Sequence, residues 1–82
     1  MKTIHKYAVT NKLFLAPKDF KPLFFGRQGT DYFVWAEVDT AADQVPFHIA
    51  LFGTGEEIPQ NRRYIGSVVA DPYVWHAYWG RA

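Results

Sequence analysis

The sequence predicts an all-β protein, and three observations lead to this fold class. Short runs rich in β-branched and aromatic residues recur along the 82 residues, and Phe, Tyr and Trp make up 18% of the chain. Each run is about as long as an ordinary strand. Proline and glycine separate the runs, and no segment has the apolar periodicity of a long helix. We therefore expect an antiparallel meander of about six short strands, closed into a small barrel or sandwich, with at most one short helical turn.

The expected strands follow one another along the whole chain. They cover residues 3–10, 22–28, 32–39, 46–52, 63–69 and 73–79. The segment between the first two has three consecutive apolar residues and then Pro17, whose ring disfavours the helical region for Ala16. The other helix candidates, 40–44 and 56–62, are long enough for a single turn only.

The connections between the runs predict which strands pair. Gly29 supplies the positive φ that a tight hairpin turn needs, and Asp71 followed by Pro72 is typical of another turn. Strand 22–28 should therefore pair with 32–39, and strand 63–69 with 73–79. The connection 40–45 is also short, so we expect strands 32–39 and 46–52 to be antiparallel neighbours.

Composition and charge limit the class of protein. The absence of cysteine excludes disulfides and thiolate zinc sites, and the even spread of proline and glycine indicates a single domain over residues 1–82. The net charge of +1 provides no broad field for nucleic acid or anionic lipid. No apolar run is long enough for a membrane span or a signal-peptide core. We expect a cytoplasmic protein that does not bind membranes, and the charge balance argues against nucleic acid as the main partner.

Because of their aromatic residues, several expected strands are apolar on both faces. One face of strand 32–39 carries Val34, Ala36 and Val38, and the other carries Phe33 and Trp35. We expect the smaller aliphatic residues to fill the interior while the aromatic rings lie outside, although the reverse assignment stays open. The second face must be covered by a loop, a second copy of the chain or another protein. The candidate protein-binding residues are Phe24, Phe33, Trp35, Trp75 and Trp79.

Residues with catalytic or metal-binding chemistry are few. His5, His48 and His76 lack the spacing of a metal motif, and they are expected to be hydrogen-bonded on sheet faces. Ser67 is the only serine, and no pairing with a histidine follows from its position. The sequence therefore predicts a protein without a metal ion, a cofactor or enzymatic activity.

A glycine-rich loop suggests an alternative function. In Gly53-Thr54-Gly55, two glycines allow backbone amides to converge on an anion. The lysine of a P-loop is missing, and Glu56 and Glu57 would repel an anion. The small-ligand candidates are Gly53, Thr54, Gly55, Arg62, Arg63 and Tyr64. In this alternative the protein is a sponge that holds an anionic nucleotide signal between subunits.

Several short motifs resemble a known group of proteins. They are Ile4-His5-Lys6-Tyr7, Val34-Trp35-Ala36-Glu37-Val38-Asp39, Phe47-His48-Ile49, Gly53-Thr54-Gly55, Ile58-Pro59, Tyr64-Ile65-Gly66-Ser67-Val68 and Val74-Trp75-His76. From Ile4 to Tyr78 the chain resembles a family of small uncharacterised bacteriophage and prophage proteins. The resemblance departs at Leu23-Phe24-Phe25 and in the tail from Trp79. It implies no activity, but accessory phage proteins of this size often act by binding.

The leading functional prediction is a non-enzymatic binding protein. It would use an aromatic sheet face, assemble as a homo-oligomer, and act as a phage-encoded inhibitor of a host defence or regulatory protein in the host cytoplasm. Besides the nucleotide sponge, two further alternatives are a single-stranded nucleic-acid binder and a structural component of a virion.

Overall fold

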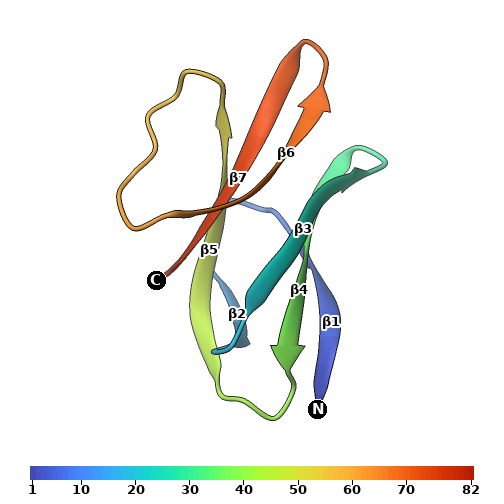
Figure 1. Ribbon diagram of the computed structural model, residues 1–82, viewed down its shortest axis with the longest axis vertical. Coiled ribbons are helices and arrows are strands. Elements are labelled where there is room, and N and C mark those ends of the chain that lie inside the picture. The colour runs from blue at the N-terminus through green and yellow to red at the C-terminus, as the bar shows by residue number, and fades with distance from the viewer.

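Seven antiparallel strands in two sheets make up the structure, a computed structural model that describes all 82 residues (Figure 1). The strands are β1 (Lys2–Ala8), β2 (Phe14–Pro17), β3 (Lys21–Gln28), β4 (Asp31–Asp39), β5 (Gln44–Gly53), β6 (Arg63–Ala70) and β7 (Tyr73–Arg81). The predicted all-β class is confirmed, and of the two expected forms the sandwich is present rather than a closed barrel. No helix is present that could cross a membrane.

The strand order confirms both expected hairpins. One sheet has the order β1-β4-β3 and the other β2-β5-β7-β6. β3 and β4 pair up to Gln28 and Asp31, and Gly29 in the turn between them has a φ of 61°. β6 and β7 pair up to Ala70 and Tyr73. Local turn chemistry therefore determines these two pairings.

The expected pairing of strand 32–39 with strand 46–52 is wrong. The turn after Asp39 carries the chain from one sheet to the other, and β4 pairs with β1 and β3 instead. In the sandwich, Val34 of β4 and Phe47 of β5 both belong to the buried core between the sheets. Because the chain crosses from one sheet to the other, each sheet covers the apolar face of the other. In a single flat sheet these apolar faces would be exposed to water.

One strand was not expected from the sequence. Residues 14–17 form β2, which pairs only with the first half of β5. The ring of Phe14 packs against Phe47 with ring centroids 6.1 Å apart. Pro17 is the last residue of this edge strand, a position that tolerates a residue without an amide hydrogen. Four residues show too little alternation to be recognised without their partner strand.

The core lies between the two sheets. The predicted inward direction of Val34, Ala36 and Val38 is confirmed, since none of these side chains is exposed to solvent. The remaining buried apolar residues are Ala16, Phe20, Phe25, Phe47, Ile49 and Ala77. Small aliphatic residues of β4 thus face large aromatic rings, a combination that fills space densely.

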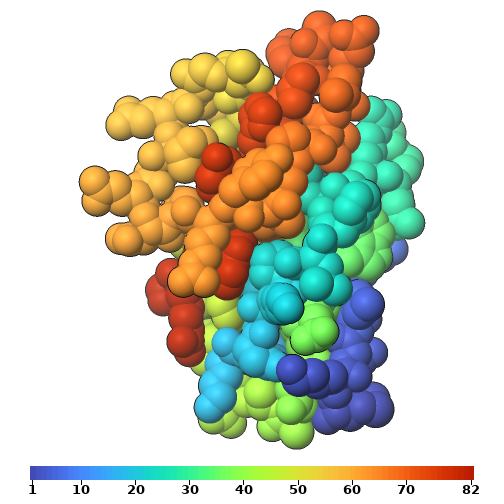
Figure 2. Space-filling model, viewed as in Figure 1, coloured from blue at the N-terminus to red at the C-terminus, as the bar shows by residue number.

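The edges of the sandwich are joined by side-chain packing. β3 and β6 lie beside each other without a hydrogen-bonded ladder, and Figure 2 shows them in contact as the teal and orange segments. An ideal Cβ at Gly66 would lie 3.5 Å from the Cβ of Phe25, an ordinary van der Waals distance, so the two strands are within packing distance here. On the other side, the rings of Tyr7 and Phe14 join β1 to β2 at 5.2 Å.

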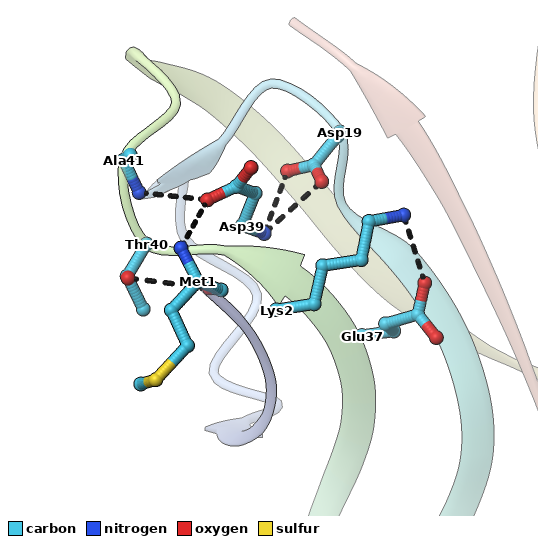
Figure 3. Close-up of polar contacts among 7 residues, drawn as sticks. All are labelled: Met1, Lys2, Asp19, Glu37, Asp39, Thr40 and Ala41. Carbon is cyan, nitrogen blue, oxygen red and sulfur yellow. Dashed lines mark hydrogen bonds and ion pairs between the residues drawn. The ribbon is translucent and has the colours of Figure 1, made fainter.

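A cluster of polar contacts lies where β4 turns towards β5 (Figure 3). The amide of Asp39 donates to both carboxylate oxygens of Asp19, at 3.1 and 3.0 Å. The carboxylate of Asp39 accepts from the amide of Ala41 at 3.0 Å and from the Met1 ammonium at 2.9 Å. These hydrogen bonds hold the pKa of Asp39 below its usual value, the bond from the ammonium contributing most. The cluster connects the start of β1, the β2–β3 turn and the crossover.

Candidate functional site

The outer face of the three-stranded sheet carries an exposed apolar cluster. We call Ile4, Phe24, Phe33 and Trp35 the aromatic face. Phe24 and Ile4 are 60% and 58% exposed, whereas Trp35 is half-buried between its neighbours. Its ring centroid is 5.6 Å from that of Phe24 and 6.1 Å from that of Phe33. The rings therefore form one continuous surface on the side away from the core.

A register shift directs Phe24 to this face. The pairing of β3 with β4 shifts between Pro22 and Phe24, so that Phe24 lies opposite Trp35 and Phe25 lies opposite the core residue Val34. Without this bulge the two neighbouring phenylalanines would exchange faces.

Polar side chains surround the aromatic face. Nζ of Lys2 lies 3.6 Å from Oε2 of Glu37, and Nζ of Lys6 donates to Oε1 of Gln28 at 3.0 Å. Nζ of Lys6 also lies 4.6 Å from the ring centroid of Phe33. An apolar centre with a polar rim containing both charges is the usual organisation of a protein-binding surface.

Two of the predicted protein-binding residues lie elsewhere. Trp75 and Trp79 are on β7, alternate with the buried Ala77, and pack against the core. The ring of Trp79 contacts those of Phe20 and Phe47 at centroid distances of 5.3 and 5.8 Å. The structure therefore brings Phe24, Phe33 and Trp35 together and places both other tryptophans on the inner side of the opposite sheet.

A hydrogen-bonded chain occupies the outer face of the four-stranded sheet. Ser67 Oγ lies 2.7 Å from Nδ1 of His76, and Thr54 Oγ1 lies 3.1 Å from Nε2 of the same ring. The chain continues from Ser67 Oγ to the hydroxyl of Tyr64 at 2.6 Å. Ser67 and His76 are paired in the β6–β7 register, which explains why they meet. Thr54 belongs to the loop after β5, so this chain fastens that loop to the sheet.

The pairing of Ser67 with His76 was not expected from the sequence. It depends on a second shift in register, between Tyr64 and Gly66, that only the paired strands define. A serine next to a histidine is half of a nucleophilic site, but no carboxylate is hydrogen-bonded to this ring. Both ring nitrogens already have hydroxyl neighbours, so the arrangement suits a histidine that positions the loop.

The other candidate ligand residues are spread over separate places. Arg62 Nη1 lies 2.7 Å from Nε2 of His48, and the guanidinium of Arg63 lies 5.5 Å from the ring centroid of Trp79. Desolvation and, to a smaller extent, the charge of Arg62 lower the pKa of His48. The carboxylate of Glu56 accepts from the amide of Gly53 at 2.7 Å, so an acidic group occupies one end of the predicted anion loop. The structure does not unite the six residues in one site.

The three histidines lie apart. His48 contacts Arg62, His76 contacts Ser67, and His5 lies beside the ring of Tyr7. No group of three or more histidine, cysteine, aspartate or glutamate side chains is arranged to hold a metal ion.

Comparison of the sequence with family models gave a match over the full length of the chain. The chain belongs to the family described as "Domain of unknown function (DUF7352)", which covers residues 1–82. The comparisons with curated proteins and with solved structures found no match. The expected likeness to a family without an assigned activity is thus confirmed at this level, and a bacteriophage origin stays a prediction.

The DUF7352 domain brings together three motifs that stand far apart in its sequence. Thr54 comes from the Gly-Thr-Gly loop, Ser67 from the Tyr-Ile-Gly-Ser-Val strand, and His76 from the Val-Trp-His segment. They meet around one imidazole ring. In the structure these three segments are joined by one hydrogen-bonded chain.

Proposed function

We propose that this DUF7352 domain is a non-enzymatic protein-binding domain whose contact surface is the aromatic face. The observation that carries the proposal is the position of Phe24. Its ring is 60% exposed on the edge strand β3, beside Trp35 of the central strand β4. Together with Ile4, Phe33 and Trp35 it forms an exposed apolar patch, and such patches are typical of surfaces that another molecule covers.

The chemistry of the surface fits a protein partner. Trp and other aromatic residues in a desolvated centre contribute most of the binding energy of protein interfaces, while the surrounding polar rim excludes water. Trp35 with Phe24 supplies such a centre, and the Lys2–Glu37 pair and Lys6 supply the rim.

The partner proposed first is a second copy of the chain. Two sheets pack face to face about 10 Å apart, and a two-fold axis would stack the aromatic face on itself. The rim carries both Lys2 and Glu37, so each copy offers both charges to the other. In the setting that the sequence resemblance implies, the same surface would cover a host defence or regulatory protein and block its function.

The experiment is a comparison of solution mass between matched variants. Tyr73 is as exposed as Phe24, at 60%, and stacks on Trp75 at 5.6 Å, the same centroid distance as between Phe24 and Trp35. Phe24→Ala and Tyr73→Ala therefore remove similar rings from opposite sheets. We expect light scattering to give a dimer for the wild type and for Tyr73→Ala, and a monomer for Phe24→Ala.

Two outcomes contradict self-association through the aromatic face. A wild-type protein that stays monomeric at millimolar concentration has no self-association through this face. Equal loss of the dimer in both variants places the contact elsewhere. A third outcome is a monomeric wild type that captures a host protein, with capture lost in Phe24→Ala and kept in Tyr73→Ala. The aromatic face would then remain the contact surface, and the host protein would replace the second copy as the partner.

A further inference from the structure

We propose that a cleft at the start of β6 and the end of β7 binds a small organic phosphate. The cleft encloses about 370 Å³, within the range of small-molecule sites. It is separate from the aromatic face and from the Gly-Thr-Gly loop, so this inference does not depend on the proposed function. The lining residues are Lys18, Phe47, Asn61, Arg63, Trp79, Gly80 and Arg81.

Three cations line the cleft without an opposing carboxylate. Lys18, Arg63 and Arg81 make no ion pair, since the ion pairs in the molecule are those of Met1 with Asp39 and Lys2 with Glu37. None of the seven lining residues is acidic. In a chain with a net charge of +1, three unpaired cations around one cleft form a local excess of positive charge. An anion with several oxygen atoms would relieve their mutual repulsion and accept hydrogen bonds from all three.

One acidic residue near the cleft, Asp19, is engaged elsewhere. Asp19 follows Lys18 in the sequence, but both of its carboxylate oxygens accept from the amide of Asp39 at the crossover (Figure 3). Its charge therefore belongs to the polar cluster there rather than to the cleft.

The fold holds the cationic segments close to one another. The ideal Cβ of Gly80 would lie 3.0 Å from the carbonyl oxygen of Asn61, so only a residue without a side chain lets the loop pass this near to β7. Asn61 has a φ of 63°, a conformation that asparagine tolerates better than most residues. The chain then enters β6 at Arg63. Figure 2 shows the orange start of β6 and the red end of β7 close together on one face.

The cleft also has an aromatic wall. Trp79 is anchored by Phe20 and Phe47, and the guanidinium of Arg63 lies over its ring at 5.5 Å from the centroid. Arg63 is therefore held in place by a cation–π contact while its nitrogen atoms stay available to an anion. A volume of about 370 Å³ exceeds what a bare phosphate ion fills, so the remaining space beside Trp79 suits an attached organic group.

Calorimetric titration with adenosine monophosphate, ribose 5-phosphate, inorganic phosphate and sulfate tests the proposal. We expect the two organic phosphates to bind more tightly than inorganic phosphate, and sulfate to bind most weakly. Lys18→Gln and Arg81→Gln should each weaken the binding about tenfold, the usual loss of one hydrogen bond to a charged group. Lys12→Gln is the matched control, since Lys12 is also an exposed loop lysine but does not line the cleft.

Three results would overturn the inference. The first is the absence of binding by either organic phosphate at about 10 mM in low salt, where screening is weak. The second is equal binding of inorganic phosphate, which removes the role of the aromatic wall. The third is an equal effect of Lys12→Gln and Lys18→Gln, which leaves only a general attraction to a cationic surface. Thermal unfolding of each variant shows whether it is folded under the titration conditions.

Discussion

The ring of Phe24 lies where a side chain on Gly26 would otherwise be. An ideal Cβ at residue 26 would be 2.5 Å from Cε2 of Phe24, closer than any real contact. Both residues are on β3 and face the outer side of the sheet, next to Trp35. The absent side chain of Gly26 thus lets an exposed ring lie along the sheet and form part of the aromatic face.

Gly26→Ala should displace the ring of Phe24 without removing it. The exposed ring can rotate away, and alanine suits a strand better than glycine, so we expect the free energy of unfolding to change by less than about 1 kcal/mol. The proposed dimer should weaken, because Phe24 no longer covers Trp35. The Trp35 indole signal in a two-dimensional NMR spectrum would report the movement. An unshifted signal would show that the ring of Phe24 stays in place.

Gly80→Ala should destabilise the fold by about 1–3 kcal/mol, the usual cost of overpacking. Its Cβ would lie 2.9 Å from Cε1 of His48 and 3.0 Å from the backbone oxygen of Asn61, and the backbone cannot rotate away. Gly53→Ala is the control, since the nearest atoms there are at an ordinary 3.7 Å. Urea unfolding compares the two variants. Equal stability would mean that the loop over Gly80 moves freely.

The two tryptophan substitutions should differ in their cost. Trp79→Ala removes a ring packed on Phe20 and Phe47, so we expect a loss of about 3 kcal/mol or more. Trp35→Ala removes contacts with Phe24 and Phe33 on the outer face and should cost about 1 kcal/mol while abolishing the proposed dimer. Thermal unfolding and light scattering measure both effects. Similar destabilisation by the two would place Trp35 in the core.

The chain around His76 should behave as one cooperative unit. Ser67→Ala and Thr54→Val each remove one partner of the ring and should cost about 0.5–1.5 kcal/mol. Both hydroxyls are hydrogen-bonded to the same imidazole ring. The loss of one hydroxyl therefore changes where the ring proton lies, and the hydrogen bond of the other hydroxyl depends on that position. We expect the double variant to cost about 0.5 kcal/mol less than the sum of the single variants. Additive costs would show that the two hydrogen bonds are independent.

His48 should make the protein less stable in mild acid. Its pKa in the folded state is lowered by desolvation and by Arg62, so the unfolded chain takes up the proton first as the pH falls. The stabilising effect of neutral His48 is therefore complete above about pH 6.5, the unfolded value, and is lost as the pH falls through the lower folded value. Urea unfolding between about pH 7.5 and 5 should show a smaller decrease for His48→Gln. An identical decrease in both proteins would contradict this assignment.

Much of the fold could be predicted because its causes are local. The alternation of Val34, Ala36 and Val38 with Phe33 and Trp35 defines the two faces of β4 wherever that strand lies. A glycine with positive φ determines the β3–β4 hairpin in the same way. The crossover after Asp39 could not be predicted, because a short connection permits either pairing within one sheet or passage to the other.

The candidate sites depended on contacts between distant segments. Phe24 faces outward because of a bulge, and Ser67 meets His76 because of another, and neither shift in register has a clear signature in one strand read alone. The placement of Trp75 and Trp79 against the core likewise required knowing which side of β7 the opposite sheet covers.

By itself, the order of residues determined that this chain forms strands, where two of its hairpins turn, and which residues of β4 share a face. Each of these follows from side-chain size, backbone sterics and a two-residue period, which act over a few positions. Only the tertiary structure decided how the strands divide between two sheets, and which rings and cations meet. The burial of each inner face depends on the surface opposite it, and that surface comes from a different part of the chain.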